Sequence, residues 1–162
     1  MLLYHGSNVA VSKPHIINAN KGLDFGAGFY TTSDIEQAKR WAVLKTKRRR
    51  KGNPTVSVFC FDAQKICEEL NVKIFEKADR EWLDYVVANR KGKYEGEQYD
   101  IVIGPVANDR TILTINDYVS GAFPAETALA LLEPAKLSDQ YTFLTYAGIK
   151  TLVFKEVLTN VG

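Results

Sequence analysis

The chain has 162 residues, of which 46% are hydrophobic and 25% charged, and its formal net charge is +2. This length predicts one domain, residues 1–162, that can bury a core without disulfides or metal, and the net charge is too small to predict an obligate nucleic-acid binder. Cys60 and Cys67 show no metal-binding spacing, and neither a signal peptide nor a membrane-spanning run is recognisable, so we expect a cytoplasmic protein.

Apolar and turn-forming residues predict strands and helices in irregular alternation. Strands are expected at residues 2–4, 28–32, 55–61, 72–75, 101–103, 141–144 and 151–154. Helices are expected at residues 33–50, 63–70, 78–90, 108–118 and 124–132. Ser33 is the expected cap of the first helix, because Glu36 follows at capping-box spacing. The order does not fit a doubly wound parallel sheet and predicts a compact α+β domain with one or two small sheets.

Two segments near the amino terminus carry the functional argument. They are Tyr4-His5-Gly6-Ser7 and the stretch from Asp24 to Thr32, which contains Gly26, Gly28 and Tyr30. Glycine allows a ligand to approach the main chain closely, and an aromatic ring can stack on a flat, electron-poor group. Together the two segments predict two walls of a nucleotide-binding slot.

These segments, with a third near the carboxyl terminus, resemble the three ordered motifs of the ADP-ribosyltransferase superfamily in its His-Tyr-Glu branch. The matching residues are His5-Gly6, Tyr30 with the threonines that follow it, and Asp139-Gln140-Tyr141. A closer similarity is to a bacterial family of that superfamily long labelled a domain of unknown function. This similarity spans nearly the whole chain, through Leu3–Ser7, Asp24–Thr32 with Ala38 and Trp41-Ala42, Tyr99–Asp109, and Ser138–Phe143.

The resemblance implies ADP-ribosyltransferase-like split antiparallel sheets with flanking helices, which grip NAD in the cleft between the sheets without a metal. By position, His5 is expected to bind the adenosine ribose, and the backbone of Gly6 to hold the nicotinamide carboxamide. Tyr30 is expected to stack on the nicotinamide ring. Gln140 stands where the branch normally has a glutamate. Further candidates for binding NAD are Phe25, Gly28, Thr31, Thr32 and Asn108.

The glutamine in the third motif limits the expected chemistry. Cleavage of the nicotinamide glycosidic bond builds positive charge on the ribose, so a site must hold the leaving ring and the ribose hydroxyls in place. Gln140 retains a hydrogen bond but has no charge and cannot act as a general base. Chain elongation is therefore not expected, and mono-transfer, slow transfer and no catalysis remain as alternatives.

Each candidate also has a purely structural interpretation. For His5 and Tyr30 it is packing, for Gly26 and Gly28 a turn or bulge before a strand, for Gln140 a solvated position at a strand start, and for Asn108-Asp109 a helix cap. Phe25 either closes over the slot or fills the core.

A basic run ends the first predicted helix. No acidic residue occurs between Gln37 and Phe61, whereas this stretch contains Lys39, Arg40, Lys45, Lys47, Arg48, Arg49, Arg50 and Lys51. A solvated helix face is the favoured interpretation, because cations suit the negative end of a helix. Contact with nucleic-acid phosphate or with an acidic partner is the alternative.

The combined expectation is a mono-ADP-ribosyltransferase that uses NAD as co-substrate and modifies an unknown macromolecular acceptor, protein or nucleic acid. By resemblance, such bacterial proteins often act as toxins in toxin-antitoxin or phage-related systems, which would imply an antitoxin partner. An NAD glycohydrolase and a catalytically silent module that binds a nucleotide or nucleic acid are the alternatives.

Overall fold

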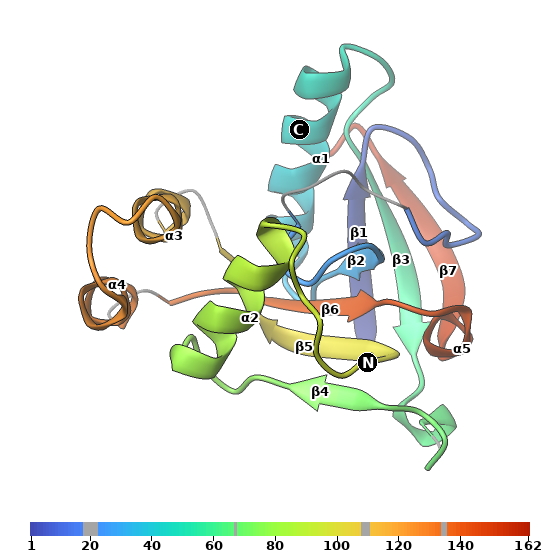
Figure 1. Ribbon diagram of the computed structural model, residues 1–162. Coiled ribbons are helices and arrows are strands. Elements are labelled where there is room, and N and C mark those ends of the chain that lie inside the picture. The colour runs from blue at the N-terminus through green and yellow to red at the C-terminus, as the bar shows by residue number, and fades with distance from the viewer. Residues whose placement is uncertain (18–22, 67, 108–110, 134–135) are drawn as a thin grey trace.

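The computed structural model describes residues 1–17, 23–66, 68–107, 111–133 and 136–162. Figure 1 shows the arrangement of the helices and strands. The strands are β1 (Leu2–Ser7), β2 (Phe29–Thr31), β3 (Thr55–Phe61), β4 (Val72–Ile74), β5 (Ile101–Pro105), β6 (Asp139–Phe143) and β7 (Leu152–Thr159). The helices are α1 (Ile35–Arg49), α2 (Arg80–Arg90), α3 (Ile112–Val119), α4 (Ala125–Leu132), α5 (Tyr146–Ile149) and a short 3-10 helix, Ala63–Lys65.

The strands form two separate small sheets, which confirms the predicted α+β class. One sheet has the order β1-β3-β7 and is antiparallel throughout. The other has the order β2-β6-β5-β4, in which the pair β4 and β5 is parallel and the other pairs are antiparallel. Because β4 and β5 run in the same direction, they need a crossover, and α2 lies within it.

The two sheets are the inner layers of the molecule and helices cover their outer faces. Between the sheets lies an apolar core to which both contribute: Leu3, Phe29, Phe59, Phe61, Ile101 and Phe143. On the outer face of the first sheet, Ala38 and Ala42 of α1 pack against Val56 and Val58. On the outer face of the second sheet, a larger core holds α2, α3 and α4; its members include Phe25, Trp82, Leu83, Val86, Val102, Ile115 and Leu132.

The two sheets meet where β1 passes β2. The Tyr4 amide donates to the Thr32 carbonyl at 2.8 Å, and the Thr32 amide donates to the Tyr4 carbonyl at 3.0 Å. Helix α1 lies directly against β1 at Gly6, where a Cβ atom would stand 2.0 Å from the Ala38 carbonyl oxygen. The glycine of the first motif is therefore needed for helix packing.

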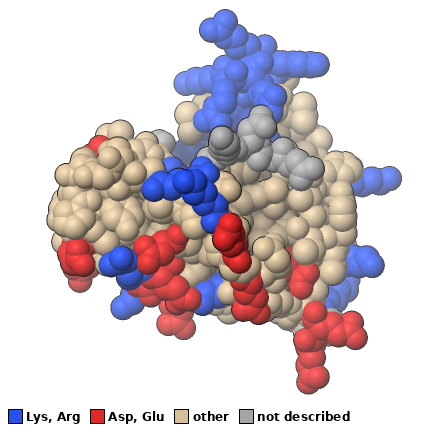
Figure 2. Space-filling model, viewed as in Figure 1, with Lys and Arg blue, Asp and Glu red and all other residues tan. Residues whose placement is uncertain are grey.

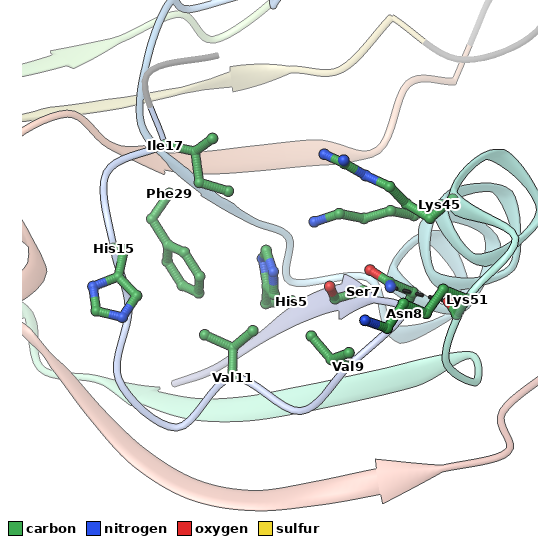
Figure 3. Close-up of a pocket in the computed structure, with 11 residues that line it drawn as sticks. His5, Ser7, Asn8, Val9, Val11, His15, Ile17, Phe29, Lys45 and Lys51 are labelled. Atoms are coloured by element: carbon green, nitrogen blue, oxygen red, sulfur yellow. Dashed lines mark hydrogen bonds between the residues drawn. The ribbon is translucent and has the colours of Figure 1, made fainter.

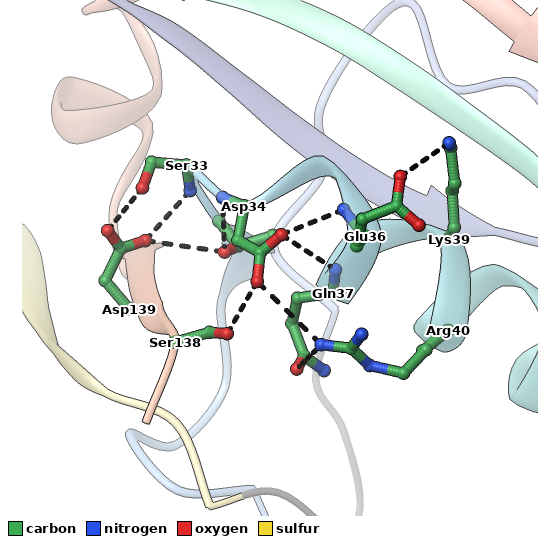
Figure 4. A network of polar contacts seen from close by, with 9 residues as sticks. Ser33, Asp34, Glu36, Gln37, Lys39, Arg40, Ser138 and Asp139 are labelled. Carbon is green, nitrogen blue, oxygen red and sulfur yellow. Dashed lines mark hydrogen bonds and ion pairs between the residues drawn. The ribbon is translucent and has the colours of Figure 1, made fainter. Parts of the chain in front are cut away.

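The cap of helix α1 lies one residue later than predicted, in a polar network shown in Figure 4. Its cap is Asp34, whose Oδ1 accepts from the amides of Glu36 at 2.9 Å and Gln37 at 3.3 Å. Ser33 instead donates from its amide, at 2.8 Å, and from its hydroxyl to the carboxylate of Asp139 on β6. The Ser33 cap was thus a wrong prediction, because that side chain is engaged across the sheet.

Other element boundaries also differ from those predicted. In the segment expected to be helical over 63–70, the described residues form only the 3-10 helix, and α5 was not predicted. Strand β7 extends to Thr159, five residues beyond the expected end, because it pairs along β3. Asn108-Asp109, the expected cap of α3, lie outside the described residues, and the described part of α3 begins at Ile112. Among the described helices, none has both the length and the apolar character to cross a membrane.

We expect Gly6→Ala to destabilise the fold by about 3 kcal/mol, because overpacking against a main-chain carbonyl forces the helix to move. Gly92→Ala is the control: its φ of +65° strains any side chain, but an added Cβ meets nothing within 4 Å, so a loss of only about 1 kcal/mol is expected. Urea unfolding measures both values, and an equal loss in the two variants would contradict the packing role.

Candidate functional site

A pocket of about 520 Å³ opens beside His5, between the loop that follows β1 and the carboxyl-terminal end of α1. Figure 3 shows its lining residues. One side is apolar and includes Val9, Val11, Ile17 and Phe29. Lys45, Arg49 and Lys51 lie at the other side, and no acidic side chain is among the described lining residues. The pocket thus combines an apolar wall with a cationic one.

His5 lies between these two walls, and two contacts fix the orientation of its ring. The imidazole stacks on Phe29 with ring centroids 4.3 Å apart, and its Nδ1 lies 2.7 Å from the Tyr30 carbonyl oxygen. Because a carbonyl only accepts, Nδ1 carries the proton, and Nε2 is left as an acceptor. Burial lowers the pKa of His5 to about 4, an effect that the Tyr30 carbonyl opposes and nearby Lys45 reinforces. At neutral pH the site therefore contains a neutral imidazole.

The cations of the pocket are close enough to repel one another. Desolvation lowers the pKa of Lys45 first, and the positive charges of Arg49 and Arg48 lower it further. Lys51 is held at its main chain, since the Asn8 side chain donates to the Lys51 carbonyl at 3.0 Å. An anion bound here would relieve the repulsion, and phosphate groups bind such clusters through charge-assisted hydrogen bonds.

Tyr30 turns to the opposite face of β2 from Phe29, as neighbouring residues of a strand do. Its hydroxyl donates to the Gly26 carbonyl at 2.6 Å and accepts from the Phe25 amide at 3.0 Å. Burial raises the pKa of Tyr30 well above its ordinary value. In this conformation the phenol bridges the main chain of the glycine-rich turn, residues 25–28, and packs on the core beneath α2.

Gln140 is 1% exposed and belongs to a buried polar network. Its Nε2 lies 3.3 Å from Asp24 Oδ2 and 3.4 Å from the Pro105 carbonyl oxygen. Both partners are acceptors, so an amide can serve this position, whereas a carboxylate would face another carboxylate. Asp24 forms an ion pair with Arg90, whose Nη2 lies 2.5 Å from Asp24 Oδ1. The interpretation of Gln140 as a solvated residue was therefore wrong.

The structure brings some of the predicted site residues together and separates others. The His5 imidazole meets the main chain of Tyr30, but the imidazole, the Tyr30 phenol and the Gln140 amide do not surround one open space in the described part of the chain. Of the predicted NAD-binding residues whose placement is described, only His5 lines the pocket.

The remaining candidates are buried. Phe25 lies in the core beneath α2, and a Cβ atom at Gly28 would stand 2.8 Å from the Phe143 carbonyl oxygen. The Thr31 hydroxyl donates to the Tyr141 carbonyl at 2.8 Å, and the Thr32 hydroxyl accepts from the Asp34 amide at 3.0 Å. Asn108 lies outside the described residues. Within the described ranges, no group of three or more His, Cys, Asp or Glu side chains is placed to hold a metal ion.

Sequence reasoning did not connect the cationic wall with His5. The basic run was recognised, but as a separate feature, because 40 positions in sequence separate His5 from Lys45. The signal available was the helical spacing of Lys45 and Arg49, which puts both side chains on one face of α1. Apart from Phe29 on β2, the apolar wall comes from the irregular loop after β1, which no pattern identifies as part of a site.

The pKa of His5 makes a specific contribution to the pH dependence of stability. Folding keeps the imidazole neutral, so stability is unaffected above the ordinary pKa of 6.5 and falls as the pH drops from 6.5 toward 4. Between pH 7 and pH 5 we expect the wild type to lose roughly 2 kcal/mol more than His5→Gln does. Urea unfolding at both pH values measures this difference. His15→Gln, which removes an exposed histidine of the same pocket, is the control and should lose as much as the wild type; identical losses in all three proteins would contradict the assignment.

The position of Gln140 predicts a pH-dependent cost for Gln140→Glu. Burial and the nearby Asp24 would raise the pKa of the introduced carboxyl, so the folded state is destabilised above the ordinary pKa of about 4.3, and increasingly as the pH rises. We expect a loss of about 3 kcal/mol at pH 7 and a much smaller one at pH 4.

Gln140→Met is the matched control, since it removes the hydrogen bonds without adding charge and should show a loss that does not change with pH. Thermal or urea unfolding at pH 4 and pH 7 compares the two variants. If they behave alike at both pH values, Asp24 does not determine the residue type at position 140.

Comparison with known proteins identifies the family of the chain. No curated protein matches it significantly. The family model described as "Protein of unknown function (DUF3990)" matches residues 1–154, which is most of the chain. The protein belongs to the DUF3990 family.

Proposed function

We propose that this protein is an ADP-ribosyltransferase-like NAD-binding protein that transfers one ADP-ribose unit to a macromolecule, and that NAD binds in the pocket beside His5. The observation that carries the proposal is the composition of that pocket: a neutral, stacked imidazole stands between an apolar wall and the cations Lys45 and Arg49. A dinucleotide has matching parts, namely flat rings, ribose hydroxyls and two negatively charged phosphates.

Each part of the pocket has a role in this proposal. The Nε2 of His5 accepts a hydrogen bond from a ribose hydroxyl, since Nδ1 is committed to the Tyr30 carbonyl. Phe29 and the apolar side chains of the loop contact the adenine. Lys45 and Arg49 bind the pyrophosphate. Two small sheets that meet at β1 and β2 support the resemblance to the superfamily, because this is where the first two motifs come together.

A catalytically silent nucleotide-binding module is the second candidate. It is favoured by the engagement of both other motif residues: the Tyr30 hydroxyl makes two hydrogen bonds to the main chain, and Gln140 is buried beside Asp24. Transfer from bound NAD would require the nicotinamide end to reach Tyr30, which the described conformation packs beneath α2.

The phosphate contacts predict how binding responds to substitution. Lys45→Gln/Arg49→Gln is expected to weaken NAD binding by about tenfold or more, because two charge-assisted hydrogen bonds are lost. The same variant should bind adenosine, which has no phosphate, as the wild type does. Calorimetry measures both ligands, and Lys65→Gln/Lys150→Gln, which removes two exposed cations outside the pocket, is the control. Failure of the wild type to bind NAD would contradict the proposal.

Turnover separates the candidates once binding is established. The protein is incubated with labelled NAD and a cell lysate, and the products are digested with protease or nuclease. Label attached to a macromolecule supports a transferase. Release of nicotinamide without labelling indicates an NAD glycohydrolase instead, and binding without turnover indicates the silent module.

A further inference from the structure

The carboxyl-terminal end of α1 carries three cations that do not belong to the pocket. Lys47, Arg48 and Arg50 are all exposed, whereas Lys45, Arg49 and Lys51 line the pocket. The first three are called the outer cations below. Arg48 is near enough to Lys45 to lower its pKa, after desolvation and the charge of Arg49, so the outer cations adjoin the cationic wall of the pocket at the end of the helix.

In the described part of the chain, no acidic side chain forms an ion pair with the outer cations. The ion pairs of α1 in the described residues, Lys39 with Glu36 and Arg40 with Asp34, lie at its amino-terminal end. The sequence from Gln37 to Phe61 contains no aspartate or glutamate. Figure 2 shows a group of basic side chains gathered over the end of α1, while most acidic side chains of that face lie in its lower half. The small net charge of the chain therefore conceals a strong separation of charge.

Stabilisation of the helix does not account for so many cations. The negative end of a helix is equivalent to about half an elementary charge. All cations of the last turn share the attraction of this one partial charge. Six cations lie between Lys45 and Lys51, and in addition to desolvation the positive charges of Arg49 and Arg48 lower the pKa of Lys45. An external polyanion would remove this repulsion.

The composition of the region favours nucleic acid over an acidic protein. Protein interfaces have an apolar centre, and lysine is depleted there. In the stretch from Lys45 to Lys51, every residue except Thr46 is a cation. Sequence-independent binding of a phosphate backbone uses lysine and arginine in this way and needs no apolar anchor.

We propose that the outer cations bind the phosphate backbone of a nucleic acid, which is the acceptor of the ADP-ribose held in the adjoining pocket. The acceptor role rests on the proposed function, whereas the binding itself does not. In the transfer, the bond between the nicotinamide nitrogen and the ribose C1′ breaks and nicotinamide leaves with the electron pair. A nucleophilic nitrogen or oxygen of the nucleic acid forms the new bond to C1′ and loses its proton to solvent.

Binding is tested with the full chain and fluorescent 20-nucleotide probes: single-stranded DNA, single-stranded RNA and a DNA duplex. Anisotropy is measured between 50 and 200 mM salt. The variant Lys47→Gln/Arg48→Gln/Arg50→Gln is expected to bind the preferred probe about tenfold or more weakly at the lowest salt. Its slope of log affinity against log salt should be smaller by about 2 for a single strand and by about 3 for the duplex, since each lost contact contributes about 0.7 or about 0.9.

The control removes three exposed cations elsewhere, as Lys65→Gln/Lys150→Gln/Lys155→Gln, and changes the net charge equally. It should bind the probes as the wild type does. An equal loss in both triple variants, no probe binding by the wild type at 50 mM salt, or competition by polyglutamate as effective as that by an oligonucleotide of equal charge would each overturn the proposal. Circular dichroism and thermal unfolding verify that both variants fold.

NAD binding, measured in parallel, separates this proposal from the previous one. The outer-cation variant is expected to bind NAD within about twofold of the wild type, because the cations of the pocket are unchanged. If the protein binds the probes but not NAD, the proposed function is refuted, and nucleic-acid binding by the outer cations is supported. A protein that binds NAD but none of the probes refutes this inference alone. Label from NAD that nuclease removes supports the acceptor role, and label that only protease removes overturns it.

Discussion

Two main-chain hydrogen bonds between Tyr4 and Thr32 determine how the sheets lie against each other, and much of the site follows from them. Strand alternation turns the residue after Tyr4, His5, toward the space between the sheets. The same alternation turns Tyr30 toward the other face of β2. His5 and Tyr30, which are joined by a hydrogen bond, thus present their rings to different layers of the molecule. The imidazole is available to the pocket, and the phenol belongs to the core beneath α2.

The glycines of the two motifs illustrate how a functional pattern and a packing requirement can coincide. Gly6 allows α1 to lie on β1, and Gly28 allows β2 to lie close to β6. Neither requires a ligand to explain why it is glycine. The contribution of these residues to the site is indirect, because the close approach of α1 brings Lys45 and Arg49 to the pocket.

The fold class and most elements could be predicted from the sequence because they depend on local patterns. The run Thr55–Phe61 reads as a strand and is one, and the apolar spacing around Trp82 and Tyr85 correctly indicated α2. Long-range polar contacts could not be predicted in the same way. Ser33 has the local spacing of a cap, but Asp139, more than 100 residues away in sequence, takes its hydrogen bonds.

The candidate site was only partly visible in the sequence for the same reason. His5 was identified, but the cationic wall depends on how α1 crosses β1, which no local pattern encodes. For Gln140, the motif suggested a missing charge. Its burial beside Asp24 depends on the register of β5 with β6 and on the path of the glycine-rich turn.

The pairing of Gln140 with Asp24 also has an evolutionary consequence. Among the residues that the structure describes, one guanidinium, that of Arg90, faces this buried carboxylate, and it can offset one negative charge but not two. Positions 24 and 140 are therefore chemically interdependent, so an ancestor or descendant with an acid at position 140 is expected to have a neutral residue at position 24. Members of the family would then have one acidic residue at these two positions, at either 24 or 140.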